Sequence, residues 1–211
     1  MTSAIQAVLF DYGGVLTGPM RNSIGAWLAA DDIDPASLTA TLKAWMSRDV
    51  PDGSPIHRLE TGELSVDEFG ALFAAQLVTR TGVPVVADGV LARMFANMEL
   101  DEDMFRLAAE LRDQGLKVGL LSNSWGNSYP RARIDSLFDP VVISGEVGLR
   151  KPHSEIYELA ARRLDLAPET IVFIDDAQPN LVGARASGLK TILHTTATET
   201  RAQLAEVVGA R

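Results

Sequence analysis

The sequence lacks cysteine altogether, and it also lacks any apolar run long enough to span a membrane. Without cysteine there are no disulfide bonds, thiolate metal ligands or cysteine nucleophiles. The longest apolar runs, such as 118–121, are only long enough for a strand. The N-terminus has no basic segment followed by an apolar stretch, so no secretory signal is evident. We therefore expect a cytoplasmic protein without a membrane partner.

Lysine and arginine are scarce as well. The chain has 19 of them against 28 aspartates and glutamates, which gives a formal net charge of −9. Binding to nucleic acid or to an anionic membrane depends on clustered cations, and the sequence contains no such cluster. A small anionic substrate is still compatible with this composition, because a bound cation and a few backbone amides that point at the substrate can make the local electrostatic potential positive.

Strands and helices alternate along the second half of the chain. Compact apolar runs predict strands, and apolar residues at helical spacing predict the helices between them. This alternation indicates an α/β fold with a parallel sheet and right-handed crossovers. The expected strands are 117–122, 141–144, 170–174 and 190–194, and the expected helices are 102–112, 154–164, 181–187 and 199–208, with Asp101 as the N-cap of the first.

The first half departs from this rhythm. A first strand ends at Asp11 and the next at Ser122, more than a hundred residues later, whereas a strand–helix–strand unit needs roughly 30 residues. We therefore predict a core of residues 1–16 and 98–211 and a helical insertion of residues 17–97 that lies above the carboxyl edge of the sheet as a lid. The helices expected in the insertion are 22–30, 35–47, 66–78, opened by a capping box at Ser65, and 84–98.

Asp11 is the first candidate for chemistry. It follows the apolar strand 7–10 and precedes Gly13 and Gly14. A carboxylate in this position leaves the sheet at its carboxyl edge, where open α/β folds bind ligands. The glycines allow other backbone groups to approach it closely. This placement suits a nucleophilic aspartate, although an aspartate after a strand also serves as a turn former or helix cap.

Three further segments fall where the topology would bring them to the same edge. Ser122 and Asn123 follow the strand 117–121 and offer a hydroxyl and backbone amides where a helix is expected to begin; alone, they would also serve as an N-cap. Lys151 lies in a loop before a helix. Asp175 and Asp176 are adjacent carboxylates at a strand end, and they repel each other unless a cation lies beside them. Oxygen ligands of this kind suit Mg²⁺.

With all four segments in view, the chain resembles the haloacid dehalogenase-like (HAD) superfamily, and within it the phosphatases with a helical cap inserted after the first motif. Sugar-1-phosphate phosphatases and the phosphatase domain of soluble epoxide hydrolase are similar to it. The resemblance covers nearly the whole chain and implies a Rossmann-like, doubly wound sheet with a small all-helical cap domain. The segments that carry it are 10–15, 121–123, 148–152 with 156–157, 173–176 with Asn180, and 58–69 in the insertion.

The resemblance implies a mechanism. Asp11 would attack phosphorus to form an aspartyl-phosphate, which water then hydrolyses. Mg²⁺ would be held by the carboxylate of Asp11, the backbone carbonyl of Gly13 and the carboxylate of Asp176, with Asp175 further from the ion. The substrate would be a small phosphorylated metabolite.

The resemblance also assigns the residues around the phosphoryl group. Lys151 and the hydroxyl of Ser122 would stabilise the charge on the transferred group, and Asn123 and Gly14 would bind the substrate. The oligomeric state is not evident from the sequence.

Gly13 departs from the pattern of these phosphatases, which commonly carry a second aspartate there as general acid and base. Glycine keeps the backbone carbonyl for the metal and loses the proton carrier, whose help is worth roughly 10²–10⁴-fold in rate. Leaving groups that are stable as anions, such as those of sugar 1-phosphates, tolerate this loss. His57 and Glu60 of the insertion are alternative proton donors, with a surface role as the competing interpretation for each.

Three functions therefore remain open. The first is a Mg²⁺-dependent phosphatase of small phosphomonoesters. The second is a non-catalytic binding or regulatory protein of the same fold, for which Gly13 would mark lost activity. The third is a 2-haloacid dehalogenase, which uses the same aspartate on carbon without a metal. The paired Asp175 and Asp176 argue against the third function, because such dehalogenases lack the acidic pair.

Overall fold

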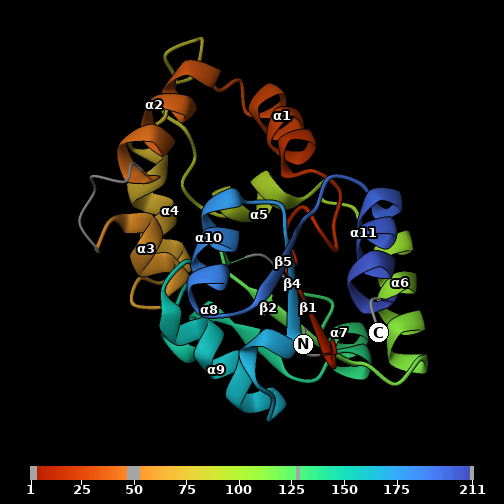
Figure 1. Cartoon of the computed structure of the whole chain (residues 1–211). Helices are drawn as coiled ribbons and strands as arrows, with labels where there is room; N and C mark the ends of the chain where they lie inside the picture. Colours follow the sequence, from red (N-terminus) through yellow and green to blue (C-terminus); the bar gives the residue numbers. More distant parts are fainter. Residues whose placement is uncertain (1–3, 47–52, 127–128, 210–211) are drawn as a thin grey trace. The chain divides into compact units, whose positions relative to one another are not determined.

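The computed structural model describes residues 4–46, 53–126 and 129–209, and this part of the chain divides into two compact units (Figure 1). The sheet unit comprises residues 4–18, 99–123 and 129–209. The helical unit comprises residues 19–46, 53–98 and 124–126. The short segment 124–126 thus packs with the helical unit, although it follows a strand of the sheet unit in the sequence.

The sheet unit contains a five-stranded parallel sheet in the order β3-β2-β1-β4-β5, which confirms the predicted fold class (Figure 1). In the register, Phe10 pairs with Leu120 on one side and with Ile174 on the other. The residues that follow β1, β2 and β4 therefore meet at one edge of the sheet. The strands are β1 (Ala7–Phe10), β2 (Lys117–Ser122), β3 (Val141–Ile143), β4 (Ile171–Asp175) and β5 (Lys190–Leu193).

Helices cover both faces of the sheet, as a doubly wound fold requires. On one face Leu9 of β1 belongs to a buried cluster with Tyr157 and Leu181 of two helices. On the other face the ring of Phe10 packs against Phe138, which in turn contacts Phe105. The helices are α6 (Glu102–Asp113), α7 (Arg131–Leu137), α8 (Ser144–Val147), α9 (Ser154–Leu164), α10 (Gln178–Ala186) and α11 (Ala197–Gly209), with a 3₁₀ turn at Pro168–Thr170.

The helix boundaries follow local capping chemistry. Asp101 caps α6 as predicted, since its side chain accepts hydrogen bonds from the backbone amides of Asp103 and Met104. The helix α10 begins at Gln178, three residues earlier than expected, because Pro179 is accommodated in the first turn. In the described residues 123–126 no helix follows Ser122, and the next helix of the described chain, α7, begins at Arg131.

The helical unit is built around aromatic side chains, with the rings of Phe69 and Phe73 stacked 5.4 Å apart and Trp27 next to Phe73. The capping box between Ser65 and Glu68 is present as predicted. The helices are α1 (Met20–Ala30), α2 (Pro35–Met46), α3 (Pro55–Glu60), α4 (Val66–Ala74) and α5 (Val90–Phe95); residue 47, expected to end the second of them, lies outside the described residues.

Three features of the helical unit differ from the expectation. Helix α3 was not predicted; it starts on the N-cap Ser54, with Pro55 in its first turn. Helix α4 stops at Ala74, and α5 covers only part of the expected range 84–98. The chain between them forms an antiparallel bridge between Val78 and Pro84, which takes these residues out of any helix.

Glu60 and Trp125 connect two distant parts of the helical unit. The indole Nε1 of Trp125 donates a hydrogen bond of 2.8 Å to Oε1 of Glu60, and its ring lies near that of Phe69. Glu60 is 4% exposed, so the surface role considered for it is wrong. Its burial follows from this indole partner, which satisfies one carboxylate oxygen.

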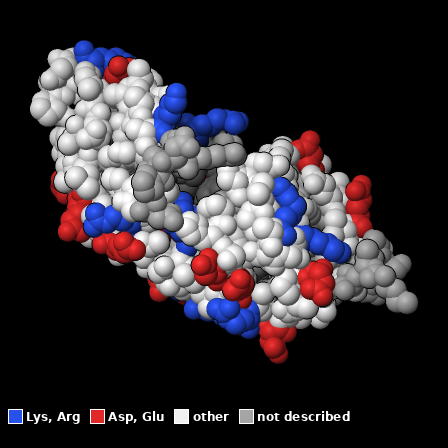
Figure 2. Space-filling view, turned by 60° about the vertical axis from the view of Figure 1, so that its left-hand side comes forward, with Lys and Arg blue, Asp and Glu red and all other residues white. Residues whose placement is uncertain are grey.

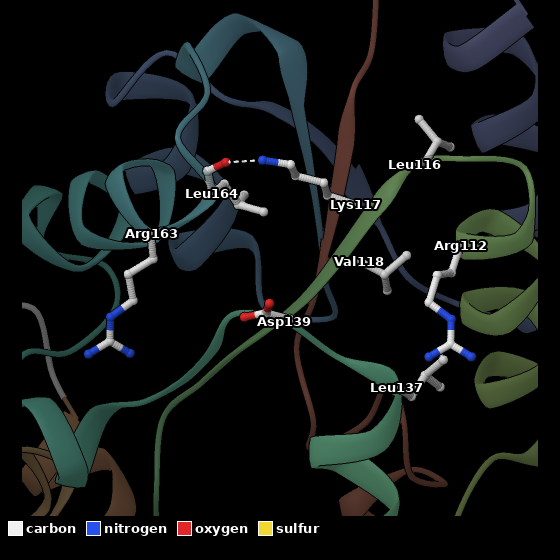
Figure 3. Close-up of a pocket in the computed structure, with 8 residues that line it drawn as sticks. All are labelled: Arg112, Leu116, Lys117, Val118, Leu137, Asp139, Arg163 and Leu164. Carbon is white, nitrogen blue, oxygen red and sulfur yellow. Dashed lines mark hydrogen bonds between the residues drawn. The ribbon is translucent and has the colours of Figure 1, made fainter.

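At the amino edge of the sheet lies an open hollow of about 290 Å³ (Figure 3). Lys117, the first residue of β2, donates to the backbone carbonyl of Leu164 at the end of α9, and Arg112 donates to the carbonyl of Ser136 near the end of α7. Cations at the carboxyl ends of helices interact favourably with the negative end of the helix dipole. These side chains therefore have a structural role. The hollow is lined by Arg112, Leu116, Lys117, Val118, Leu137, Asp139, Arg163 and Leu164.

The charged side chains on the face shown in Figure 2 are interspersed rather than gathered into a patch of one sign. This face therefore has no concentration of positive charge of the kind that binds polyanions. None of the helices in the described ranges is long and apolar enough to cross a membrane.

Candidate active site

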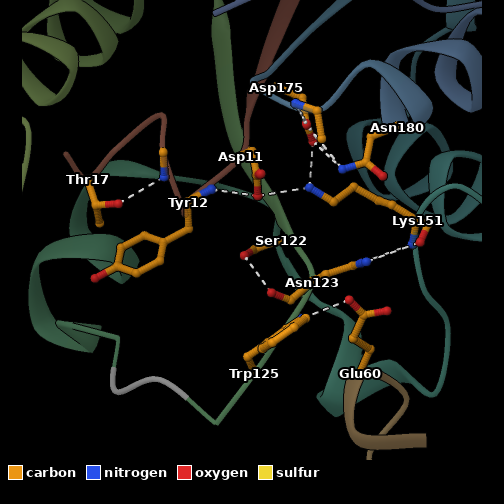
Figure 4. A network of polar contacts seen from close by, with 12 residues as sticks. Asp11, Tyr12, Thr17, Glu60, Ser122, Asn123, Trp125, Lys151, Asp175 and Asn180 are labelled. Atoms are coloured by element: carbon orange, nitrogen blue, oxygen red, sulfur yellow. Dashed lines mark hydrogen bonds and ion pairs between the residues drawn. The ribbon is translucent and has the colours of Figure 1, made fainter. Parts of the chain in front are cut away.

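Asp11 lies directly after β1 and is buried. Its backbone amide donates to the carbonyl of Ile174, which continues the pairing of β1 with β4 by one residue. Its Oδ1 atom accepts hydrogen bonds from the backbone amide of Tyr12 at 2.7 Å and from Nζ of Lys151 at 2.8 Å (Figure 4). The carboxylate is thus held in a fixed orientation at the carboxyl edge of the sheet.

Lys151 lies between two carboxylates. Its Nζ atom is 2.8 Å from Oδ1 of Asp11 and 2.7 Å from Oδ2 of Asp175, and its side chain is 1% exposed (Figure 4). Burial lowers the pKa of Lys151, but the two carboxylates more than reverse that effect and hold the pKa above its usual value. The side chain is therefore an ammonium group, and two of its three hydrogens point at carboxylates.

The backbone of Lys151 is held by Asn123. The side chain of Asn123 accepts a hydrogen bond from the Lys151 amide at 2.9 Å and donates one to the Lys151 carbonyl at 3.1 Å. On the other side α10 packs closely, since a Cβ atom on Gly183 would lie 2.3 Å from the carbonyl oxygen of Pro152. The loop that carries Lys151 is thereby fixed from two directions.

Asp175 is completely buried, and hydrogen-bond donors surround its carboxylate. Besides Lys151, it accepts from the backbone amide of Ala177 at 2.7 Å and from Nδ2 of Asn180 at 3.0 and 3.1 Å (Figure 4). The backbone carbonyl of Asn180 accepts from the hydroxyl of Tyr157. These contacts position Asp175 rigidly and, through it, Lys151.

Asp11, Asp175 and Asp176 offer carboxylate oxygens that all lie within 4.8 Å of one another. With all three carboxylates ionised, the ammonium of Lys151 would offset one charge and leave two negative charges. Burial raises the pKa of Asp11, to about 8, against the lowering effect of Lys151, and burial also raises the pKa of Asp176. A divalent cation would remove this repulsion, and hard oxygen donors fit Mg²⁺. The donor set therefore fits the expected metal.

The turn after Asp11 requires glycine at position 14. Gly14 has a φ of +76°, and its amide donates to Oγ1 of Thr17 at 2.9 Å. A Cβ atom here would lie 2.3 Å from Oδ2 of Asp176. The backbone and the candidate metal site thus both exclude a side chain at this position.

We expect Gly14→Ala to weaken Mg²⁺ binding roughly 10- to 100-fold, because the added methyl group displaces the Asp176 carboxylate. The positive φ should also cost about 1–2 kcal/mol of stability. Titration of Mg²⁺ by calorimetry measures the first effect. Gly115→Ala is the matched control, since Gly115 has a φ of +90° and nothing within 4 Å of its Cβ position. Equal Mg²⁺ affinities in the two variants would contradict the prediction.

Ser122 ends β2 with its hydroxyl buried. The Oγ atom lies 3.0 Å from the hydroxyl of Tyr129. Sequence reasoning did not single out Tyr129, because a lone tyrosine in a polar loop carries no periodic or motif signal. It also did not single out Thr17, whose hydroxyl oxygen accepts the hydrogen bond from the backbone amide of Gly14.

The structure therefore brings together four of the residues that the sequence predicted for the site: Asp11, Lys151, Asp175 and Asp176. The side chain of Asn123 binds the backbone of Lys151, and its role in substrate binding stays a prediction, as does that of Gly14. Gly13 lies two residues after Asp11 and is partly exposed.

A sequence model described as a haloacid dehalogenase-like hydrolase matches residues 5–188 of the chain. Acyl-CoA dehydrogenase family member 10 of Mus musculus is 30% identical over 89% of this chain, and the match spans 18% of that protein. Bifunctional epoxide hydrolase 2 of Sus scrofa is 25% identical over 98% of this chain and 39% of its own length. The chain thus spans well under half of these two relatives.

Glyceraldehyde 3-phosphate phosphatase of Methanopyrus kandleri is similar along most of both chains, with 28% identity over 89% of this chain and 83% of the relative. Among solved structures, a HAD family enzyme from Bacteroides thetaiotaomicron in complex with magnesium and inorganic phosphate has a TM-score of 0.66 at 20% identity, covering 91% and 95% of the two chains. An L-2-haloacid dehalogenase has a TM-score of 0.64 at 24% identity, covering 90% and 86%. At these identities the two structures show that the fold is shared.

Proposed function

Because the chain belongs to the haloacid dehalogenase-like hydrolase family, we propose that this hydrolase is a Mg²⁺-dependent phosphatase of small phosphomonoesters. The observation that carries the proposal is a set of three carboxylates whose oxygens lie within 4.8 Å of one another, two of them paired with the buried Lys151. Phosphatases among its relatives support the same reaction class.

In the proposed reaction, a carboxylate oxygen of Asp11 attacks phosphorus, and the bond from phosphorus to the leaving oxygen breaks. Water then attacks the aspartyl-phosphate, which releases inorganic phosphate and restores the carboxylate. Hydrogen bonds from Tyr12 and Lys151 orient the nucleophile before the substrate arrives. This orientation reduces the entropy lost on reaching the transition state.

Asp11 and Asp176, together with the backbone carbonyl of Gly13, would hold Mg²⁺, with Asp175 further from the ion. When bound, the ion supplies positive charge that offsets repulsion between the nucleophile and the phosphoryl oxygens. It also favours the ionised form of Asp11, whose pKa is otherwise raised by burial.

Lys151 has one ammonium hydrogen left after its contacts with Asp11 and Asp175. We assign this donor to a phosphoryl oxygen, with the hydroxyl of Ser122 as a second donor and Asn123 and Gly14 nearby. Charge on the transferred group spreads over its oxygens in a loose transition state, so fixed donors there lower the barrier.

Because position 13 is a glycine, no side chain there can protonate the leaving group, as the aspartate of similar phosphatases does. We therefore assign the enzyme to substrates whose leaving group is stable as an anion, such as sugar 1-phosphates.

We assign the helical unit to the cap domain of such phosphatases, with residues 17–97 as the insertion and residues 1–16 and 98–211 as the core. We also assign the protein to the cytoplasm. A non-catalytic binding protein is the second candidate, and Gly13 is the observation that favours it.

The substrate class is tested with a panel that pairs sugar 1-phosphates with the matching sugar 6-phosphates, and that includes p-nitrophenyl phosphate. We expect kcat/KM to be roughly 10²-fold or more higher for the 1-phosphates and the aryl phosphate, because the missing acid matters least for them. Phosphate release with saturating Mg²⁺ measures the rates, and EDTA should abolish them.

The outcomes separate the candidates. Equal rates on 1- and 6-phosphates would contradict the argument from Gly13 and leave a general phosphatase. No turnover of any phosphomonoester would favour the binding protein. Chloride release from 2-chloropropionate in EDTA would favour the dehalogenase.

A further inference from the structure

The hydroxyl of Ser122 has a partner that the proposed reaction does not use. Its Oγ atom lies 3.0 Å from Oη of Tyr129, and the carbonyl of Asn123 is 3.4 Å away. Tyr129 lies in the sheet unit, seven residues after Ser122. The contact is therefore a hydrogen bond between two hydroxyl groups at the candidate phosphoryl site.

The ring of Tyr129 is held in place by the residue that follows the nucleophile. The rings of Tyr12 and Tyr129 are 4.7 Å apart, and Tyr12 is 2% exposed. The backbone amide of Tyr12 donates to Asp11, so one residue both orients the nucleophile and supports Tyr129. The carbonyl of Tyr129 accepts from the amide of Arg131 at the start of α7, which fixes the backbone as well.

The direction of the hydrogen bond follows from the chemistry of the two groups. A hydroxyl group has one hydrogen, so Ser122 cannot donate to Tyr129 and to a substrate at the same time. A phosphoryl dianion offers only acceptors, and it therefore requires the hydrogen of Ser122. The phenol is the more acidic hydroxyl and the better donor. With a phosphoryl group bound, Tyr129 donates and Ser122 accepts.

From this geometry we infer that Tyr129 is a positioning residue whose hydroxyl donates to Oγ of Ser122 and directs the Ser122 hydrogen toward the phosphoryl oxygens. The inference rests on the proposed phosphatase function. Accepting a hydrogen bond also polarises the Ser122 hydroxyl and strengthens it as a donor. Tyr129 does not touch the reacting atoms and acts through Ser122.

Tyr129→Phe tests the inference, because it removes the hydroxyl and keeps the ring that packs on Tyr12. We expect kcat/KM to fall roughly tenfold and the inhibition constant of inorganic phosphate to rise, with an unchanged midpoint of thermal unfolding. Ser122→Ala should lower kcat/KM by about 10²-fold, the loss typical of one donor to a developing charge.

The double variant Ser122→Ala/Tyr129→Phe distinguishes positioning from packing. If Tyr129 acts through Ser122, the double variant has the activity of Ser122→Ala alone, and a full further tenfold loss would overturn the inference. Wild-type activity in Tyr129→Phe would overturn it as well and leave the phosphatase function intact. A wild-type protein inactive on the whole panel would instead overturn the proposed function, and this inference with it.

Discussion

Asp11→Asn is expected to reduce turnover of every phosphomonoester by roughly 10⁴-fold or more, because the amide cannot act as the nucleophile. The amide is nearly the same size as the carboxylate, and its oxygen can still accept the hydrogen bond from Tyr12. Steady-state phosphate release at saturating Mg²⁺ measures the loss. Mass spectrometry after a rapid acid quench should detect a phosphorylated wild-type protein and no phosphorylated variant.

The loss of activity in Asp11→Asn should not come from unfolding. Burial raises the folded pKa of Asp11 to about 8 from an ordinary value of 3.8. A raised pKa gives a contribution to stability that is fully present below about 3.8 and is lost as the pH rises through about 8. In metal-free buffer at pH 8 the variant should therefore be at least as stable as the wild type. Activity within tenfold of the wild type would contradict the assignment of Asp11 as nucleophile.

Lys151→Met is expected to have the largest effect on stability. The substitution leaves Asp11 and Asp175 buried without the ammonium group that lies 2.8 and 2.7 Å from them. Removing one partner of a buried ion pair costs roughly 3–5 kcal/mol. Urea unfolding in EDTA measures the difference, and turnover should fall to background because the donor to the phosphoryl group is lost too.

A metal titration and a surface lysine serve as controls for Lys151→Met. Mg²⁺ should stabilise this variant more than the wild type, since the cation then replaces the lost ammonium charge beside the three carboxylates. Lys43→Met, at an exposed position on α2, should change stability by less than about 0.5 kcal/mol. Equal unfolding midpoints for the two variants would contradict the role assigned to the buried lysine.

The sheet could be predicted from the sequence because its signal is local. The apolar run 117–122 forms β2 with the expected limits, and a parallel sheet brings the carboxyl ends of its strands to one edge. The position of Asp11 next to Asp175 then follows from topology alone. The predicted N-cap Asp101 was likewise found, because a cap depends only on the next few residues.

The interactions that the sequence did not reveal are those between distant residues. The burial of Glu60 depends on an indole donor 65 residues away, and nothing near Glu60 in the sequence indicates it. The hydrogen bonds between the Asn123 side chain and the backbone of Lys151, 28 residues further along, were not predicted either. Partnerships of this kind arise from tertiary packing, which a pattern of single residues does not encode.

The helical unit could not be exchanged between relatives by replacing the insertion, residues 17–97, alone. Residues 124–126 belong to it although they lie outside the insertion, and they contribute the donor that Glu60 accepts. A Cβ atom on Gly126 would also lie 2.6 Å from a methyl group of Val66. A chimera that inherits the insertion from one parent and the segment after Ser122 from another would combine two surfaces that did not evolve together. Recombination in this family should therefore respect both segments as one inherited block.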